Sequence, residues 1–180
     1  MTFLRCSLHL ARALTLLSAL VAGRAHADDY EVVTRLMNDS KSSQALDAAQ
    51  AHILANPRDP QMRFLLGVIQ SKLNRANEAL QTFLLLTQEF PELPEPYYNL
   101  AVIYASLGQF DKARETLEMA IRVNPEYATA FENLGDVYAK LAARAYSRSI
   151  ELDPKHSDAA PKLARIRELL PATRVETQSP

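Results

Sequence analysis

The sequence predicts an all-α solenoid of helical hairpins that ends in a C-terminal capping helix. Between Pro94 and Pro125, apolar residues recur twice at helical spacing, and Gly108 between the two runs marks a turn. Pro57, Pro91 and Pro125 are equally spaced along the chain, which indicates that the hairpin is repeated. Glycine is scarce, with 4 in 180 residues, and this disfavours a strand-rich fold with many glycine turns.

Residues 1–27 have the three parts of a cleavable secretory signal. Arg5 and Arg12 make a basic start, residues 13–23 (ALTLLSALVAG) form an apolar core, and residues 25–27 (AHA) are an A-x-A cleavage motif. The apolar run is shorter than the ~20 residues of a spanning helix, which disfavours an N-terminal anchor. We therefore expect cleavage after Ala27, a periplasmic location with full secretion as the alternative, and no membrane span in the mature chain.

Residues 28–59 form a degenerate unit that we expect to cap the solenoid. The apolar face of its first helix is short and ends at Leu36, and residues 38–40 (Asn-Asp-Ser) supply a turn. In its second helix, the interval from Ala45 to Pro57 is the same as the interval from alanine to proline in the two following units. Terminal repeats need a polar outer face for solubility, which this unit has.

The unit 94–127 resembles the tetratricopeptide repeat family, because large, small and turn residues stand at the family's signature offsets: Tyr97, Leu100, Ala101, Tyr104, Gly108, Ala113, Leu117, Ala120 and Pro125. The interval between the prolines also equals the family's repeat length. Residues 60–93 match less completely, since Arg63 and Gln70 replace two large residues. The resemblance implies a right-handed superhelix of stacked hairpins, with the first helix of each hairpin lining a concave face.

Residues 128–154 begin as a further copy of the repeat and then lose its turn. The stretch from Tyr138 to Pro154 is shorter than the stretch from Tyr104 to Pro125, and alignment places the missing part at GQFDK (108–112). Either the chain folds back through a cramped turn near Leu141, or residues 128–152 form one helix, roughly 37 Å long. We favour the single helix, which would carry an apolar stripe: Phe131, Leu134, Tyr138, Leu141, Ala145 and Leu152. Residues 155–170 then predict a capping helix, and residues 171–180 a flexible tail.

The chain after residue 27 offers few reactive groups, so we expect no enzyme, no catalytic or metal site and no cofactor. The only cysteine of the chain is Cys6, and His52 and His156 stand far apart and have the pattern of solvated surface residues. Glycines serve the repeat, with Gly135 expected to allow the close approach of two helices. Removing the signal with its three arginines would leave 17 of 20 basic residues against 21 acidic ones, which disfavours nucleic-acid binding.

The superhelix implied by the resemblance predicts a groove lined by the first helices of the hairpins. We expect its lining to be Phe64, Val68, Lys72, Tyr98, Asn99, Val102, Asn133 and Asp136, with Leu65, Ala105 and Glu132 beside them. Aromatic rings supply anchor area and asparagine amides both donate and accept, a combination that suits an extended or helical peptide. The alternative is that the valines only pack between neighbouring first helices.

A basic stripe, Lys140, Arg144 and Arg148, has the i, i+4, i+8 spacing of one helix face, which we place opposite Tyr138 and Leu141. It is either a solvated face or a contact for an acidic protein, anionic lipid or the acidic first repeats of a second copy. The sequence thus predicts a noncatalytic protein–protein interaction scaffold or adaptor in the bacterial cell envelope. A structural oligomer, such as a homodimer built through the 128–152 helix, and a regulatory subunit of an envelope enzyme stay open as alternatives.

Overall fold

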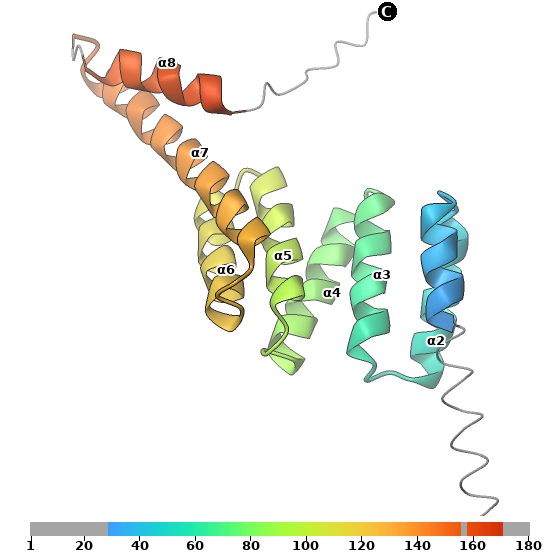
Figure 1. Ribbon diagram of the computed structural model, residues 1–180. Helices are drawn as coiled ribbons and strands as arrows, with labels where there is room; N and C mark the ends of the chain where they lie inside the picture. The colour runs from blue at the N-terminus through green and yellow to red at the C-terminus, as the bar shows by residue number, and fades with distance from the viewer. Residues whose placement is uncertain (1–28, 156–157, 171–180) are drawn as a thin grey trace, which may run out of the picture. The chain divides into compact units, whose positions relative to one another are not determined.

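The computed structural model describes residues 29–155 and 158–170, which are helical except for short connections (Figure 1). The described part contains no strand, so the all-α prediction is confirmed. The predicted signal segment 1–27 and the tail 171–180 lie outside these residues. No helix of the described part is long and apolar enough to span a bilayer. The described part of the chain divides between Thr82 and Phe83 into two compact units.

The first unit consists of a helical segment at 29–38, α2 (Ser42–Ala55), α3 (Pro60–Lys72) and the first half of α4 (Ala76–Glu89). Small and aliphatic side chains form its core: Val33, Ala45, Leu46, Ala49, Met62 and Ile69. Gln70, which replaces a large signature residue, is buried and accepts a hydrogen bond of 2.8 Å from the Thr82 hydroxyl. A polar side chain is therefore tolerated at this core position because a neighbouring helix supplies its partner.

The second unit contains the end of α4, then α5 (Pro94–Ser106), α6 (Phe110–Val123), α7 (Ala128–Leu152) and α8 (Ala159–Leu169). Successive helices pack as α5 on α6, α6 on α7 and α7 on α8 (Figure 1). Signature residues of the hairpin and the first half of α7 form the core: Tyr97, Ala101, Ala113, Leu117, Ala120, Ala130 and Val137. Of the two conformations considered for residues 128–152, the structure has the single continuous helix.

Three hairpin turns, equally spaced along the chain, have the same backbone conformation and the same closing hydrogen bond. Ser40, Asn74 and Gly108 all have left-handed backbone, with φ of 60°, 59° and 71°. The residue after each one donates its amide to a carbonyl near the end of the first helix, at 2.9 Å in all three turns. This closes the C-terminus of that helix and reverses the chain. The stretch missing from the fourth repeat (128–154) includes the position that Gly108 occupies in the third repeat (94–127). α7 therefore continues where the earlier helices turn.

Because α7 is continuous, one of its faces stays solvent-exposed, whereas the preceding repeat covers the corresponding face of α5 with its second helix. Phe131 and Tyr138 are 50% and 48% exposed, and Leu152 is 69% exposed. The expectation that Gly135 allows a close helix approach is wrong, because Gly135 is exposed and a methyl group there would meet no atom within 4 Å. The helix that would have approached it continues along α7 instead.

Candidate functional site

The predicted groove residues are divided between the two units. Phe64, Val68 and Lys72 follow one another at i, i+4, i+8 along α3 in the first unit. The first two are half-buried and Lys72 is exposed. The other five residues lie on α5 and α7 of the second unit, where they can be compared directly.

Tyr98 and Asn133 are brought together across α5 and α7, because the Asn133 amide donates to the Tyr98 hydroxyl at 3.1 Å. The same amide nitrogen donates to the Thr129 carbonyl at 2.9 Å, which holds the side chain in place. The ring of Tyr98 also packs on that of Tyr127, with centroids 5.4 Å apart. Burial raises the pKa of Tyr127, and the Glu95 carboxylate adds to this effect. The structure thus holds two tyrosines and an asparagine in one fixed cluster.

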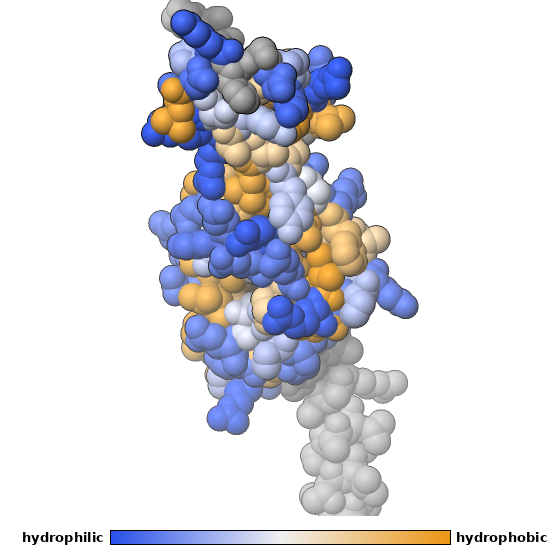
Figure 2. Space-filling view, turned by 90° about the vertical axis from the view of Figure 1, so that its left-hand side faces the viewer, coloured by the Kyte–Doolittle hydropathy of each residue, from blue (hydrophilic) through white to orange (hydrophobic). Residues whose placement is uncertain are grey.

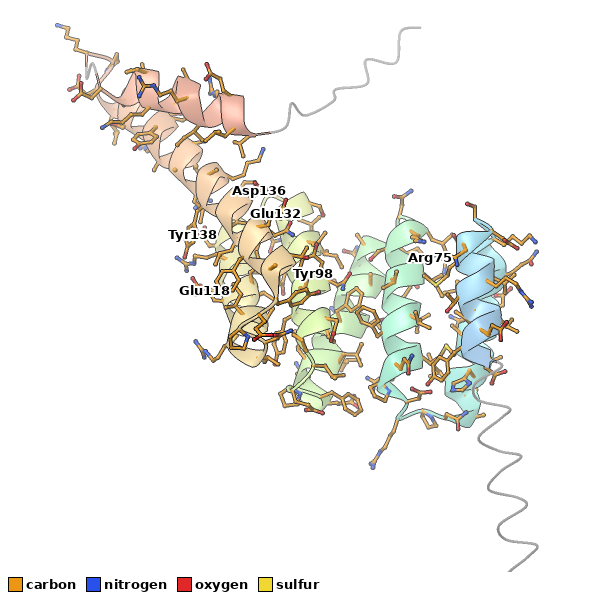
Figure 3. All side chains as sticks on the ribbon, viewed as in Figure 1. Arg75, Tyr98, Glu118, Glu132, Asp136 and Tyr138 are labelled. Atoms are coloured by element: carbon orange, nitrogen blue, oxygen red, sulfur yellow. The ribbon has the colours of Figure 1, made fainter. Side chains whose placement is uncertain are left out.

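The remaining predicted residues border this cluster in different ways. The Asn99 amide donates to the Glu95 carbonyl one turn earlier, at 2.9 Å, and Val102 is 43% exposed. Asp136 is exposed, and Figure 3 shows it with Glu132 on the same side of α7 as Tyr98. This surface, the Tyr98 face, is therefore aromatic and amide-bearing where Tyr98 meets Asn133, and it is acidic at Glu132 and Asp136.

Tyr127 and Glu95 were missed by the reasoning from sequence. Tyr127 is the residue before α7, and Leu93, one repeat earlier, is the residue before α5. A large side chain at the entry to each first helix is the signal that could have indicated Tyr127.

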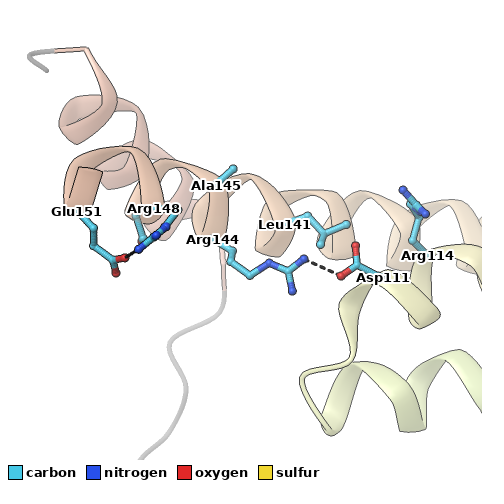
Figure 4. Close-up of a pocket in the computed structure, with 8 residues that line it drawn as sticks. Asp111, Arg114, Leu141, Arg144, Ala145, Arg148 and Glu151 are labelled. Atoms are coloured by element: carbon cyan, nitrogen blue, oxygen red, sulfur yellow. Dashed lines mark hydrogen bonds and ion pairs between the residues drawn. The ribbon is translucent and has the colours of Figure 1, made fainter. Parts of the chain in front are cut away.

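The basic stripe lies beside a surface hollow of about 710 Å³ between α6 and α7 (Figure 4). Arg144 donates to Asp111 at 2.6 Å and Arg148 to Glu151 at 2.9 Å, while Lys140 is half-buried. The Arg144 hydrogen bond holds the pKa of the Asp111 carboxyl below its usual range. Both arginines therefore already have acidic partners within the chain.

The expectation that the stripe lies opposite Leu141 is wrong. Leu141, Arg144 and Arg148 stand at i, i+3, i+7, so the three share a helix face and line the same hollow. Tyr138 donates to Glu118 of α6 at 3.1 Å, and this hydrogen bond raises the pKa of the tyrosine.

The expectation that His52 is a solvated surface residue is also wrong, since its side chain is only 1% exposed. Its Nδ1 lies 2.8 Å from Oδ2 of Asp29, and its Nε2 lies 2.8 Å from Oδ2 of Asp59. The Tyr30 hydroxyl donates to the same Asp59 oxygen, and its ring packs on the imidazole with centroids 5.5 Å apart.

Asp59 also caps α3, because its Oδ1 accepts from the amides of Gln61 and Met62 at 3.1 and 3.2 Å. Burial opposes ionisation of Asp59, but the hydrogen bonds from Tyr30, Met62 and His52 outweigh it and lower the pKa of the carboxyl. The His52 cluster therefore ties the segment 29–38, α2 and the start of α3 together. In the described part, no three His, Cys, Asp or Glu side chains are placed to hold a metal ion.

Comparisons with known proteins agree with this architecture. A tetratricopeptide repeat model matches residues 33–94, and a second model, described as a TPR repeat, matches residues 103–142. A search of curated protein sequences finds no match.

Several solved structures share the fold. The crystal structure of MamA has 21% identity and a TM-score of 0.58 over 76% of this chain and 83% of its own. YrrB, described as a TPR protein with an unusual peptide-binding site, has 28% identity and a TM-score of 0.55 over 58% of this chain and 54% of its own. PcrH, solved in complex with the chaperone binding region of PopD, has 20% identity and a TM-score of 0.59 over 63% of this chain and 90% of its own. These structures share the fold, and the two repeat models, which together match more than half of the chain, show that it belongs to the tetratricopeptide repeat family.

Proposed function

We propose that this chain is a noncatalytic protein-interaction scaffold in the cell envelope, and that the Tyr98 face of its second unit binds a peptide segment carrying basic side chains. The observation that carries the proposal is the hydrogen bond between Tyr98 and Asn133, which fixes an aromatic and amide surface across α5 and α7. A surface that is already ordered loses little conformational entropy when a ligand binds.

The chemistry of this face fits a peptide backbone with positive side chains. An asparagine amide can both donate to and accept from a peptide group, and a tyrosine ring offers flat apolar area. Glu132 and Asp136 lie one turn apart on α7 on the same side as Tyr98, so they would favour lysine or arginine (Figure 3). YrrB, with its reported peptide-binding site and 28% identity, supports a peptide ligand.

The proposed location rests on the sequence of residues 1–27 alone. Mass spectrometry of the chain isolated from cell fractions tests it. The expected species starts at Asp28 and is found in the periplasm, whereas a cytoplasmic species that keeps Met1 would contradict the proposal.

Peptide binding is tested with the purified protein and a set of fluorescent peptides that differ only in carrying lysine, glutamine or glutamate. Fluorescence anisotropy should show tighter binding of the lysine peptides, weakened by salt. Tyr98→Ala should weaken binding at least tenfold, about 1.4 kcal/mol, because it removes the anchor ring. The double variant Glu132→Gln, Asp136→Asn should retain binding and lose the preference for lysine.

Tyr138→Ala is the matched control, because Tyr138 is also a half-exposed tyrosine but lies on the other side of α7 from Tyr98 (Figure 3). It should leave peptide affinity unchanged. Equal affinities of the wild type and Tyr98→Ala for every peptide would rule out the Tyr98 face as the binding surface.

A further inference from the structure

The second unit exposes on α7 the same positions that it buries on α5. Tyr97 and Ala101 of α5 are 9% and 1% exposed and lie in the core that α5 forms with α6. Phe131 and Gly135 stand one repeat later at the corresponding places of α7, where Phe131 is 50% exposed and Gly135 faces open space. The face of α7 that corresponds to the covered face of α5 is therefore solvent-exposed, and we call it the bare face.

The bare face continues along α7 as an apolar stripe, the α7 seam, formed by Phe131, Tyr138, Ala145 and Leu152. All four are exposed, and they follow one another at heptad spacing. Apolar residues at heptad spacing stay on one side of a helix and form the contact line of helix pairs. The α7 seam runs for about 30 Å, at ~1.5 Å per residue. Figure 2, which looks at this side of the second unit, shows apolar patches among hydrophilic side chains.

The C-terminal half of α7 carries the pattern of the helix that is missing from the bare face. Once the missing turn is allowed for, Ala142, Tyr146 and Ser149 align with three buried residues of α6: Ala113, Leu117 and Ala120. In α7 the three are only half-buried. Because α7 is one continuous helix, its second half cannot turn back onto its own first half.

We propose that two copies of this chain pair antiparallel through the α7 seam, so that the second half of each α7 covers the bare face on the first half of the other. A two-fold axis between residues 141 and 142 places Phe131 against Leu152 of the partner subunit. It also places Tyr138 against Ala145 of the partner subunit. Hairpin helices are antiparallel, and this pairing restores that arrangement between chains by exchange of an identical element.

A second copy fits the α7 seam better than an unrelated helix because the seam is complementary to itself. Under the two-fold axis large residues meet aliphatic or small ones, which is the alternation that packs well across a helix pair. The hollow lined by Leu141 and Ala145 adjoins the seam and leaves room for the partner's side chains (Figure 4). α8 packs on the side of α7 that carries Tyr146, where Lys162 lies over the ring at 5.9 Å, and it leaves Leu152 of the seam 69% exposed.

The pairing does not depend on peptide binding. Tyr98, Glu132 and Asp136 lie on the side of α7 away from Tyr138, so the proposed peptide face stays open in the pair (Figure 3). Tyr98→Ala should therefore remain dimeric, and failure of one proposal leaves the other intact.

Sedimentation velocity of the purified chain across a concentration series tests the proposal. The wild type should be a dimer, and Ala145→Glu should raise the dissociation constant at least tenfold, because it buries a charge opposite Tyr138 of the partner subunit. Ala145 is exposed in the single chain and glutamate favours helix, so circular dichroism should be unchanged. Leu54→Glu, at an 86% exposed leucine on α2, is the matched control and should stay dimeric.

A second variant restores the turn instead of damaging the seam. Insertion of GQFDK after Leu141 gives Pro125 and Pro154 the same separation as Pro91 and Pro125, so residues after the insertion should fold back and cover Phe131. This variant should be a folded monomer with more protected amides in residues 128–140.

Disulfide trapping in a Cys6→Ser background fixes the direction of the pair. A mixture of Phe131→Cys and Leu152→Cys chains should form the mixed disulfide in preference to either symmetric one. A wild type that is monomeric at every concentration, a dimer unaffected by Ala145→Glu, or preferred Phe131→Cys self-crosslinking would each overturn the proposal.

Discussion

Replacing Asp59 by alanine should destabilise the first unit by about 2–4 kcal/mol. Asp59 caps α3 through two backbone amides, and loss of such a cap costs about 1 kcal/mol. It is also the partner of Nε2 of the buried His52, and a buried polar group left without a partner costs about 1–3 kcal/mol. The estimate is the sum of these two effects, and the Tyr30 hydroxyl, which also loses its acceptor, would add to it.

Urea unfolding followed by circular dichroism measures the loss, and hydrogen exchange in α2 and α3 locates it. Asp59→Asn should lose about half as much, because asparagine also caps a helix but has an amide nitrogen in place of the oxygen that bonds Tyr30 and His52. Asp29→Ala is the comparison: Asp29 bonds the same imidazole, but it caps no helix and its side chain is 54% exposed, so the variant should lose clearly less stability than Asp59→Ala.

The pH dependence gives a separate check. The folded pKa of Asp59 lies below its unfolded value, so the ionised carboxylate stabilises the fold above the unfolded pKa of about 3.9. This contribution is lost as pH falls through the folded pKa, so wild type and Asp59→Ala should converge in acid. A loss below about 0.5 kcal/mol at pH 7, or a difference that grows on acidification, would refute the reasoning.

Three further substitutions test other features of the structure. Gly135→Ala should stabilise the monomeric chain by about 0.5–1 kcal/mol in thermal unfolding, because residue 135 is exposed and has open space around it. Gly108→Ala should destabilise the chain, because the φ of Gly108 is 71°. A destabilising Gly135→Ala would show that residue 135 is covered. Ser40→Gly should stabilise the first unit by about 0.5–1 kcal/mol through relief of left-handed strain, and an unchanged urea midpoint would contradict this. Asp111→Asn should leave the urea midpoint unchanged at about 0.15 M salt, because Asp111 and Arg144 are 59% and 56% exposed, and a clear shift would give this ion pair a structural role.

The periodic features of the sequence were enough to predict the helices and much of the core. Ala45, Ala79 and Ala113 occupy the same position of successive repeats, and all three are fully buried. The predicted face of Tyr98 and Asn133 also follows from the period, because neighbouring positions of successive repeats lie on adjacent first helices. Their hydrogen bond is a consequence of that placement.

The His52 cluster could not be predicted in this way. Its members come from three elements and are joined by contacts between residues far apart in the chain, while the sequence pattern reports only on spacing within a helix. A lone histidine has the same pattern whether it is solvated or buried between carboxylates. Gly135 shows the converse error, because its signature position implied a neighbouring helix that the deletion had removed.

The three left-handed residues have a consequence for how such a chain changes its assembly. In each repeat, one residue between the two helical stretches determines how they are connected. When its φ is positive, the stretches pack side by side as a hairpin; without such a residue they form one continuous helix. Loss of the turn at the fourth interval leaves the helix sequences intact and changes only the connection between them. A short deletion in a surface turn can thus alter the partners of a repeat without altering a single core residue.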